Sequence, residues 1–126
     1  MAWTAPKTWS VGEVLTSSDM NTYVSDNTAD LRLLNESGTA TGNYTLALGD
    51  EFSVVAMNAS GSATVTVPAG TAVAFPIGAV VNVYNLGAGT VTVEGASGVT
   101  VRNAGDVLQY QEVSVRKRGT DEWVLA

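Results

Sequence analysis

Residues 62–68, SATVTVP, alternate strictly between apolar and polar side chains. In an extended chain the alanine and the two valines share one face and the two threonines share the other, because successive side chains of a strand point to opposite sides. Residues 90–95, TVTVEG, alternate in the same way, with two valines opposite a threonine and a glutamate. Both stretches predict strands with one buried face and one face in water.

The chain from Asn43 to Ala126 has this character throughout, with Val, Thr and Tyr in short runs separated by turn residues. Turns at roughly eight to twelve residues apart are typical of an antiparallel β-sandwich or barrel. About eight short strands are expected, at 43–48, 51–57, 62–67, 79–86, 90–94, 99–102, 107–116 and 122–125. The motifs NASG, GAG, GASG, NAGD and RGTD between them are expected to form hairpin loops. The sequence thus predicts a mainly β protein, with an antiparallel β domain at 40–126.

The segment 16–36 is the one stretch that predicts a helix. Thr16 and Asp19 have the spacing of a capping box, in which each side chain accepts a hydrogen bond from a backbone N–H of the other residue. Asn35 or Gly38 supplies a left-handed stop at the other end. The following SGTATG is expected to be flexible, so the helix is predicted to be a separate element between an extended arm and the β domain.

The apolar residues of this helix form a narrow line with the 4-3-4-3 spacing of a heptad repeat. Its members are Met20, Val24, Asn27, Leu31 and Leu34. A stripe this narrow suits another helix better than a sheet, so the preferred interpretation is that copies of the helix associate along it in a coiled coil, with Asn27 fixing the register. The alternative is an amphipathic helix packed on its own β domain, with Tyr23 and Leu33 widening the apolar face.

The N-terminal segment 1–15 is unusually aromatic for a terminal arm. It holds Trp3 and Trp9 on either side of Pro6, with neither helical nor strand periodicity. Each tryptophan is able to bury roughly 150–250 Å², so leaving both in water is unfavourable. The arm is therefore expected to lie against a surface, either its own domain or that of another molecule.

Composition excludes several classes of partner. The net charge is −6 with six Lys and Arg, which argues against nucleic acid, because neutralising phosphates needs clustered cations. The chain lacks cysteine, a signal-like start and an apolar run of the ~20 residues that a membrane helix needs. The one basic cluster, RKR at 116–118, is expected as an exposed strand end that guards an edge, or as a contact for an acidic partner.

The residues that most enzymes depend on are missing. Without histidine or cysteine, neither a Ser-His-Asp nor a Cys-His arrangement is possible, and thiolate or imidazole metal sites are excluded. The acidic pairs Asp50–Glu51 and Asp121–Glu122 fall at predicted turns, where solvated turn residues are the simplest interpretation. We therefore expect a protein that is not an enzyme and has no cofactor, metal site, nucleic-acid partner or membrane partner.

Two stretches resemble structural proteins of tailed bacteriophages. WTAPKTWSVGEVLTSSDMNTYVSDN resembles the opening of many head-fibre, tail-fibre and minor structural proteins. The residues that carry this likeness are Trp3, Pro6, Trp9, Gly12, Glu13, Thr16, Met20 and Asn21. Residues 44–101, closing later in DEWVLA, resemble a small β domain of such proteins, with V-P, F-P-x-G, G-A-G and late Trp landmarks.

The resemblance implies a virion protein, and such proteins are commonly trimers that insert an N-terminal arm into the particle and display a β domain outward. Because the chain holds little beyond arm, helix and β domain, we expect a homotrimeric capsid decoration, or cement, protein on the outer surface of the phage particle. Its docking residues would be Trp3, Pro6 and Trp9, against the major capsid protein or another virion protein.

The alternative function is a head-fibre or tail-fibre module that binds host-surface carbohydrate. A sugar site usually places an exposed aromatic ring beside acid or amide groups. Tyr84 with Asn82, or Tyr110 with Gln109, could form such a site.

Overall fold

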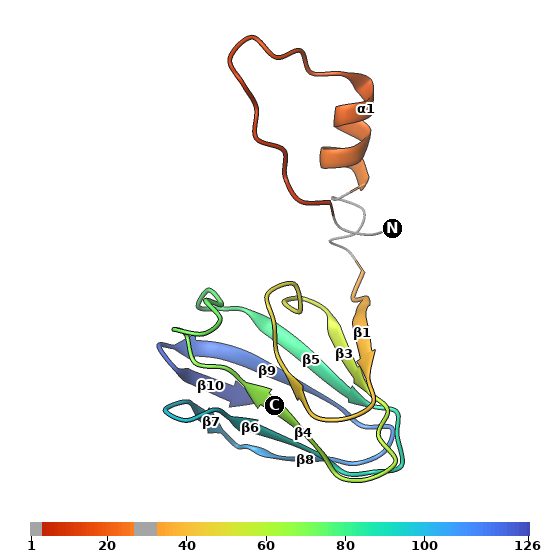
Figure 1. Ribbon diagram of the computed structural model, residues 1–126, viewed down its shortest axis with the longest axis vertical. Coiled ribbons are helices and arrows are strands. Elements are labelled where there is room, and N and C mark those ends of the chain that lie inside the picture. Colours follow the sequence, from red (N-terminus) through yellow and green to blue (C-terminus); the bar gives the residue numbers. More distant parts are fainter. Residues whose placement is uncertain (1–3, 27–32) are drawn as a thin grey trace. The chain divides into compact units, whose positions relative to one another are not determined.

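The computed structural model describes residues 4–26 and 33–126 of the chain. It divides into an N-terminal unit, Met1–Leu34, and a β unit, Asn35–Ala126, which are described separately (Figure 1).

In the N-terminal unit, helix α1 spans Ser17–Met20 and continues into a π-helical segment, η1, at Asn21–Asp26. The predicted capping box is confirmed. Thr16 Oγ1 accepts from the Asp19 backbone N–H at 3.1 Å, and Asp19 Oδ2 accepts from the Thr16 backbone N–H at 3.0 Å. The predicted end is wrong, because Leu33 and Leu34 are not helical and a strand begins at residue 36.

The β unit contains ten strands in two sheets. They are β1 (Glu36–Ala40), β2 (Tyr44–Thr45), β3 (Val54–Met57), β4 (Ala63–Val67), β5 (Val80–Asn85), β6 (Val91–Gly95), β7 (Thr100–Arg102), β8 (Gly105–Val107), β9 (Glu112–Gly119) and β10 (Glu122–Leu125). The six-stranded sheet has the order β1-β3-β5-β9-β10-β7, and the four-stranded sheet has the order β2-β4-β6-β8. The segment expected to be flexible, SGTATG, is largely strand β1.

The first six strands form a β-solenoid of about three turns (Figure 1). Each turn supplies one strand to each sheet: β1 then β2, β3 then β4, β5 then β6. Equivalent strands of successive turns lie side by side and parallel, so that Val55 pairs with Val83 and Val65 with Val93. The last four strands complete both sheets with mixed directions, since β8 and β9 run antiparallel to their solenoid neighbours while β7 runs parallel to β10.

The predicted antiparallel sandwich or barrel is therefore wrong, although the mainly β character is confirmed. The predicted alternation of buried and exposed side chains is confirmed, since Val65 and Val67 are buried and Thr64 and Thr66 are not. What alternation does not encode is the direction of the neighbouring strand, because a period of two is the same in parallel and antiparallel sheets. The 28-residue spacing of paired valines, 65 with 93, was the repeat signal that indicates a solenoid.

The motifs NASG and GAG are solenoid corners rather than hairpin loops. At these corners the chain passes from one sheet to the other, and the corner of the third turn rests directly on that of the second. The Gly89 N–H donates to Ala59 O at 3.0 Å, and a Cβ on Gly89 would lie 1.9 Å from Gly61 O. Only glycine allows backbone to approach backbone this closely.

A buried asparagine holds the same corner together. Asn85 is fully buried, its Nδ2 donates to the carbonyls of Gly89 and Val107 at 2.8 Å each, and its Oδ1 accepts from the Gly87 N–H at 3.1 Å. This one side chain satisfies three backbone groups that the corner would otherwise leave unpaired, which is why a polar residue is tolerated in the core.

The core lies between the two sheets and consists mainly of valines, with Leu46, Met57, Phe75 and Trp123. The Phe75 and Trp123 rings meet edge to face at 5.4 Å between centroids.

The RKR cluster at 116–118 is not the exposed strand edge that the sequence predicts. Its strand, β9, lies inside the six-stranded sheet. Lys117 is buried, and its Nζ donates to Phe75 O at 2.7 Å.

Candidate functional site

The N-terminal arm is folded back on α1 by a single lysine. Lys7 Nζ forms an ion pair with Glu13, lies 3.7 Å from Asp19 Oδ1, and stands 4.4 Å from the centroid of the Trp9 ring. The lysine thus combines a cation–π contact with two carboxylates, an arrangement that orients the indole. Reasoning from the sequence missed Lys7, although its position as a lone cation between two tryptophans was a usable signal.

The electrostatics of this cluster follow from its contacts. The hydrogen bond with Glu13 raises the pKa of Lys7, and the same contact lowers the pKa of Glu13. The hydrogen bond from the Thr16 side chain lowers the pKa of Asp19. All three side chains are therefore charged at neutral pH, as the ion pairs of Lys7 require.

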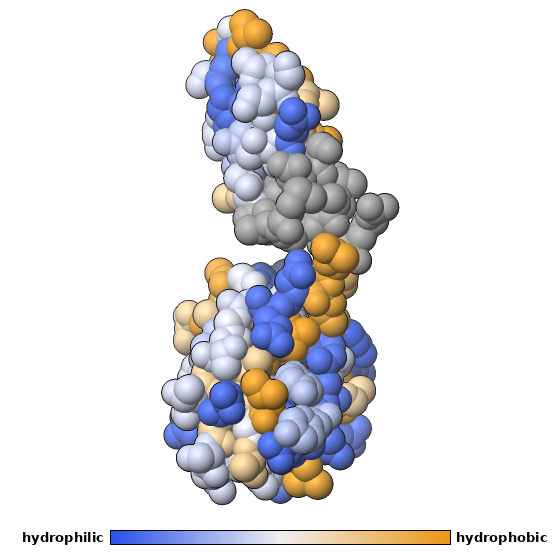
Figure 2. All heavy atoms as spheres, turned by 90° about the vertical axis from the view of Figure 1, so that its right-hand side faces the viewer, coloured by the Kyte–Doolittle hydropathy of each residue, from blue (hydrophilic) through white to orange (hydrophobic). Residues whose placement is uncertain are grey.

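The N-terminal unit has no core among its described residues. None of the side chains described between Thr4 and Val24 is buried. Large apolar side chains are instead exposed along the loop and helix, at Trp9, Val11, Val14, Leu15, Met20 and Val24. Figure 2 shows hydrophobic surface at the tip of this unit. An independently stable domain buries most of its large apolar side chains, whereas the ones named here are exposed. A group of exposed apolar side chains is typical of an interaction surface.

The predicted docking and oligomer residues fall partly within this surface. Pro6 and Trp9 are exposed, whereas Trp3 lies outside the described residues. Met20 and Val24 are exposed on α1 and η1.

Of the other predicted seam residues, Asn27 and Leu31 lie outside the described residues. Leu34 is described, and it is exposed and not helical. No coiled coil is seen in the part of the chain that the structure describes.

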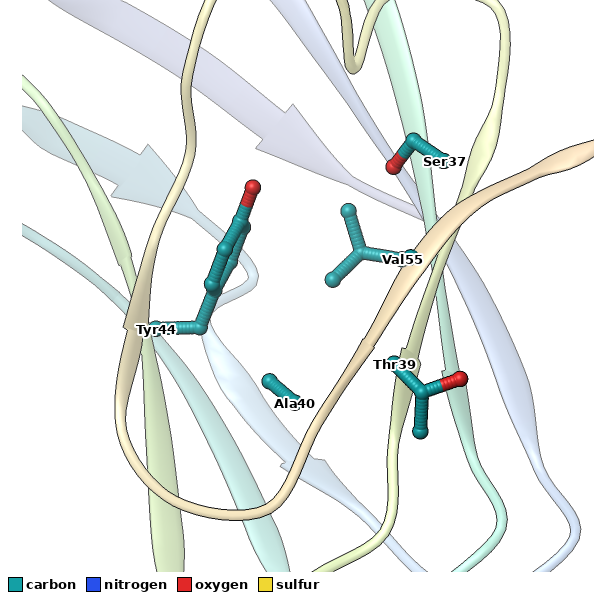
Figure 3. Close-up of a pocket in the computed structure, with 6 residues that line it drawn as sticks. Ser37, Thr39, Ala40, Tyr44 and Val55 are labelled. Carbon is teal, nitrogen blue, oxygen red and sulfur yellow. The ribbon is translucent and has the colours of Figure 1, made fainter.

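The β unit has a hollow of about 320 Å³ where its first turn begins (Figure 3). The Tyr44 ring and Val55 face each other across it, and Thr39 points away. Tyr44 Oη and Ser37 Oγ both donate to the buried Asp50 carboxylate at 2.8 Å.

Burial, reinforced by the Asp50 contact, raises the pKa of Tyr44 to about 12. The phenol is therefore neutral at physiological pH and acts as a hydrogen-bond donor. Because Asp50 also accepts from the Ala47 N–H at 2.8 Å, its carboxylate is fully engaged in holding the loop after β2.

On the outer face of the six-stranded sheet, the predicted pair of a tyrosine and an asparagine lies beside two residues that the sequence did not indicate. Asn82 and Tyr84 share this face on β5, and β9 places Ser114 and Glu112 beside them. Asn82 Nδ2 donates to Glu112 Oε2 at 2.9 Å, and Ser114 Oγ donates to Asn82 Oδ1 at 3.1 Å. The face therefore carries an aromatic ring beside an amide, a carboxylate and a hydroxyl.

The second predicted pair is held differently. Tyr110 is highly exposed with a φ of 66°, and its N–H donates to Asn85 O at 2.6 Å. Gln109 Nε2 donates to Leu86 O at 3.3 Å, so its amide is used within the fold.

The acidic pairs have structural partners. Asp121 Oδ1 accepts from the Gly70 N–H at 2.7 Å, and Glu122 lies within 3.3 Å of both Arg102 and Arg118. In residues 4–26 and 33–126, no cluster of three or more acidic side chains could hold a metal ion. Among the described helices, none has the length and apolarity required to cross a membrane.

Comparisons with known proteins give no further assignment, since no protein-family model, curated protein or solved structure matches the chain. The candidate sites are therefore the apolar N-terminal unit and the polar outer face of the six-stranded sheet.

Proposed function

We propose that this chain is a structural protein of a phage particle, a homotrimeric capsid decoration protein that attaches through its N-terminal unit and displays its β unit outward. The observation that carries the proposal is the apolar surface of the N-terminal unit, in which none of the side chains described between Thr4 and Val24 is buried. The likeness of residues 3–27 to virion-protein openings supplies the class of partner, the major capsid protein or another virion protein.

The exposed apolar side chains supply a driving force for attachment. Burying one Val, Leu or Met side chain contributes about 1.5–3 kcal/mol, against which the cost of association counts. Val11, Val14 and Leu15 are each more than half exposed and Trp9 is 44% exposed, so one partner surface could cover several such side chains. A protein bound this way to the assembled shell, and not to free subunits, stabilises the shell by mass action.

Lys7 gives the attachment surface a defined shape before binding. Its contacts with Trp9, Glu13 and Asp19 hold the loop against the helix, which lowers the entropy lost when the loop docks. Aromatic residues in such positions are common hot spots of interfaces.

The test is co-sedimentation of the purified chain with empty capsids that lack it. Trp9→Ala combined with Val14→Ser should raise the dissociation constant at least tenfold. Ile77→Ser is the matched control, because Ile77 is 67% exposed but lies in the β unit. Undiminished binding of the Trp9/Val14 variant would refute attachment through the N-terminal unit.

A second candidate function is recognition of host-surface carbohydrate by the outer face of the six-stranded sheet. The observation that favours it is the hydrogen-bonded group of Asn82, Glu112 and Ser114 next to Tyr84. Sugars are bound by stacking on an aromatic ring with polar groups at its rim.

A glycan array probed with the wild-type chain and with Tyr84→Ala tests this function. Binding that disappears in the variant supports it, with Tyr110→Ala as the control for the other predicted tyrosine. Absence of any bound glycan at high protein concentration contradicts it.

A further inference from the structure

Strand β1 is an edge strand whose start carries the charge of Glu36 and a register shift between Glu36 and Gly38, whereas Thr39 and Ala40 are in regular pairing with β3. It lies at one end of the six-stranded sheet, and its residues are exposed except for the partly covered Ala40. Natural edge strands are commonly guarded by Lys, Pro or a covering element, because unpaired backbone groups invite another strand. The sequence of β1, ESGTA, contains no lysine, arginine or proline.

The backbone groups that are free on this edge are identifiable. Ala40 O accepts from the Asn58 N–H at 2.7 Å, so the backbone of Ala40 faces β3. Because backbone groups alternate in direction along a strand, the N–H and C=O of Thr39 face the open edge. The hollow beside Tyr44 and Val55 lies at the same first turn.

Strand β7 is the opposite edge of the same sheet and runs in the same direction as β1. This follows from the pairings, since β3 and β5 are parallel to β1, β9 is antiparallel to β5, β10 is antiparallel to β9, and β7 is parallel to β10. The Thr100 N–H donates to Asp121 O at 2.9 Å, so the backbone of Val101 faces outward. The sheet could therefore be continued from one copy to the next by a parallel pair.

The two edges carry opposite charges. Glu36 is exposed on β1, and Arg102, whose side chain is 63% exposed, lies on β7, where it also contacts Glu122 at 3.3 Å. When copies stack in line, the acidic residue of one edge thus approaches the basic residue of the other.

We propose that the β units of neighbouring copies associate head to tail, with the β7 edge of one copy paired in parallel with the β1 edge of the next. This rests on the homo-oligomer of the proposed function and names its contact. Such an interface joins two different surfaces, as a trimer requires, and the rotation between copies determines whether the assembly closes into a ring.

Disulfide trapping tests the contact directly, because the chain has no native cysteine. In the proposed pairing Thr39 lies opposite Arg102 or Thr100, within reach of a disulfide. Mixing Thr39→Cys with Arg102→Cys or with Thr100→Cys should give a mixed disulfide under mild oxidation. Arg116→Cys, exposed on the interior strand β9, is the control and should not cross-link to Thr39→Cys. A dominant Thr39→Cys homodimer, or no mixed disulfide with either partner, would overturn the proposal.

Thr39→Pro gives an independent test, because it removes an N–H that faces the open edge without removing a bond to β3. Sedimentation equilibrium should show at least a tenfold rise in the dissociation constant of the oligomer, with unchanged circular dichroism. An oligomer as stable as wild type contradicts the inference. If the chain binds capsids but never forms the mixed disulfide, only this inference fails; if it forms the disulfide but does not bind capsids, only the attachment proposal fails.

Discussion

Replacing Gly89 by alanine tests whether the β unit is a stack of turns. A Cβ at this position would lie 1.9 Å from Gly61 O and 2.3 Å from Gly61 C, whereas real Cβ atoms essentially never come within 3.0 Å of such atoms. The corner of the third turn must therefore move about 1 Å away from the second. In a hairpin loop, as the sequence predicts for GAG, the same change would not bring a Cβ against the backbone of a neighbouring turn.

The displacement weakens hydrogen bonds that cross the corner. Gly89 N–H to Ala59 O is 3.0 Å long and Asn85 Nδ2 to Gly89 O is 2.8 Å, so both stretch beyond bonding distance if nothing else adjusts. Overpacking costs about 1–3 kcal/mol and each buried group left unpaired costs about 1–3 kcal/mol. Alanine also restricts the unfolded chain more than glycine does, which stabilises the folded state by about 0.4–1 kcal/mol. A net loss of about 3–5 kcal/mol is expected.

Urea and thermal unfolding followed by circular dichroism measure this loss on the full chain. For a unit of this size 3 kcal/mol lowers the Tm by at least about 12 °C. Gly61→Ala is the matched control, since the equivalent glycine one turn earlier has open space around its Cβ position. A Gly89→Ala variant within about 1 kcal/mol of Gly61→Ala would refute the stacked corner.

Three further predictions concern individual side chains. Asn85→Leu should lower the free energy of unfolding by about 3 kcal/mol in a urea titration, because three buried backbone groups lose their partner. Asn82→Leu on the outer face is the control and should change the free energy of unfolding by less than about 1 kcal/mol. The phenol of Tyr44 should ionise near pH 12 in an ultraviolet titration, with Tyr44→Phe as the comparison. Its pKa in the folded chain lies above the ordinary 10.0. The stability that the phenol contributes is therefore present below pH 10 and is lost as the pH rises toward 12. Lys7→Met should shift the Trp9 indole resonance in nuclear magnetic resonance spectra at neutral pH. The wild-type chain should show that shift only as Glu13 and Asp19 become protonated, at a pH below the ordinary range of carboxylates, because the contacts with Lys7 and Thr16 lower the pKa of both groups. An indole resonance that does not respond to either change would contradict the role of Lys7.

The candidate sites were partly accessible from the sequence. The sequence predicts Pro6 and Trp9 as attachment residues because an aromatic terminal segment needs a surface to lie against, and both residues are exposed. It does not predict Lys7, since the contacts of a lone cation depend on where the chain folds back. On the outer sheet face, Glu112 lies 30 positions from Asn82, and only strand pairing brings the two together.

The sequence by itself determined the mainly β character, the buried side of strands such as β4 and β6, and where the helix begins, because these depend on neighbours within a few positions. It did not determine β1, which was expected to be flexible. Only the tertiary structure decided that successive turns stack in parallel, that Gly89 rests on Gly61, and that Lys117 lies in the core. The physical reason is that alternation has the same period whichever way the next strand runs. The direction is set by hydrogen bonds between segments 28 residues apart and by corners that fit only when backbone meets backbone.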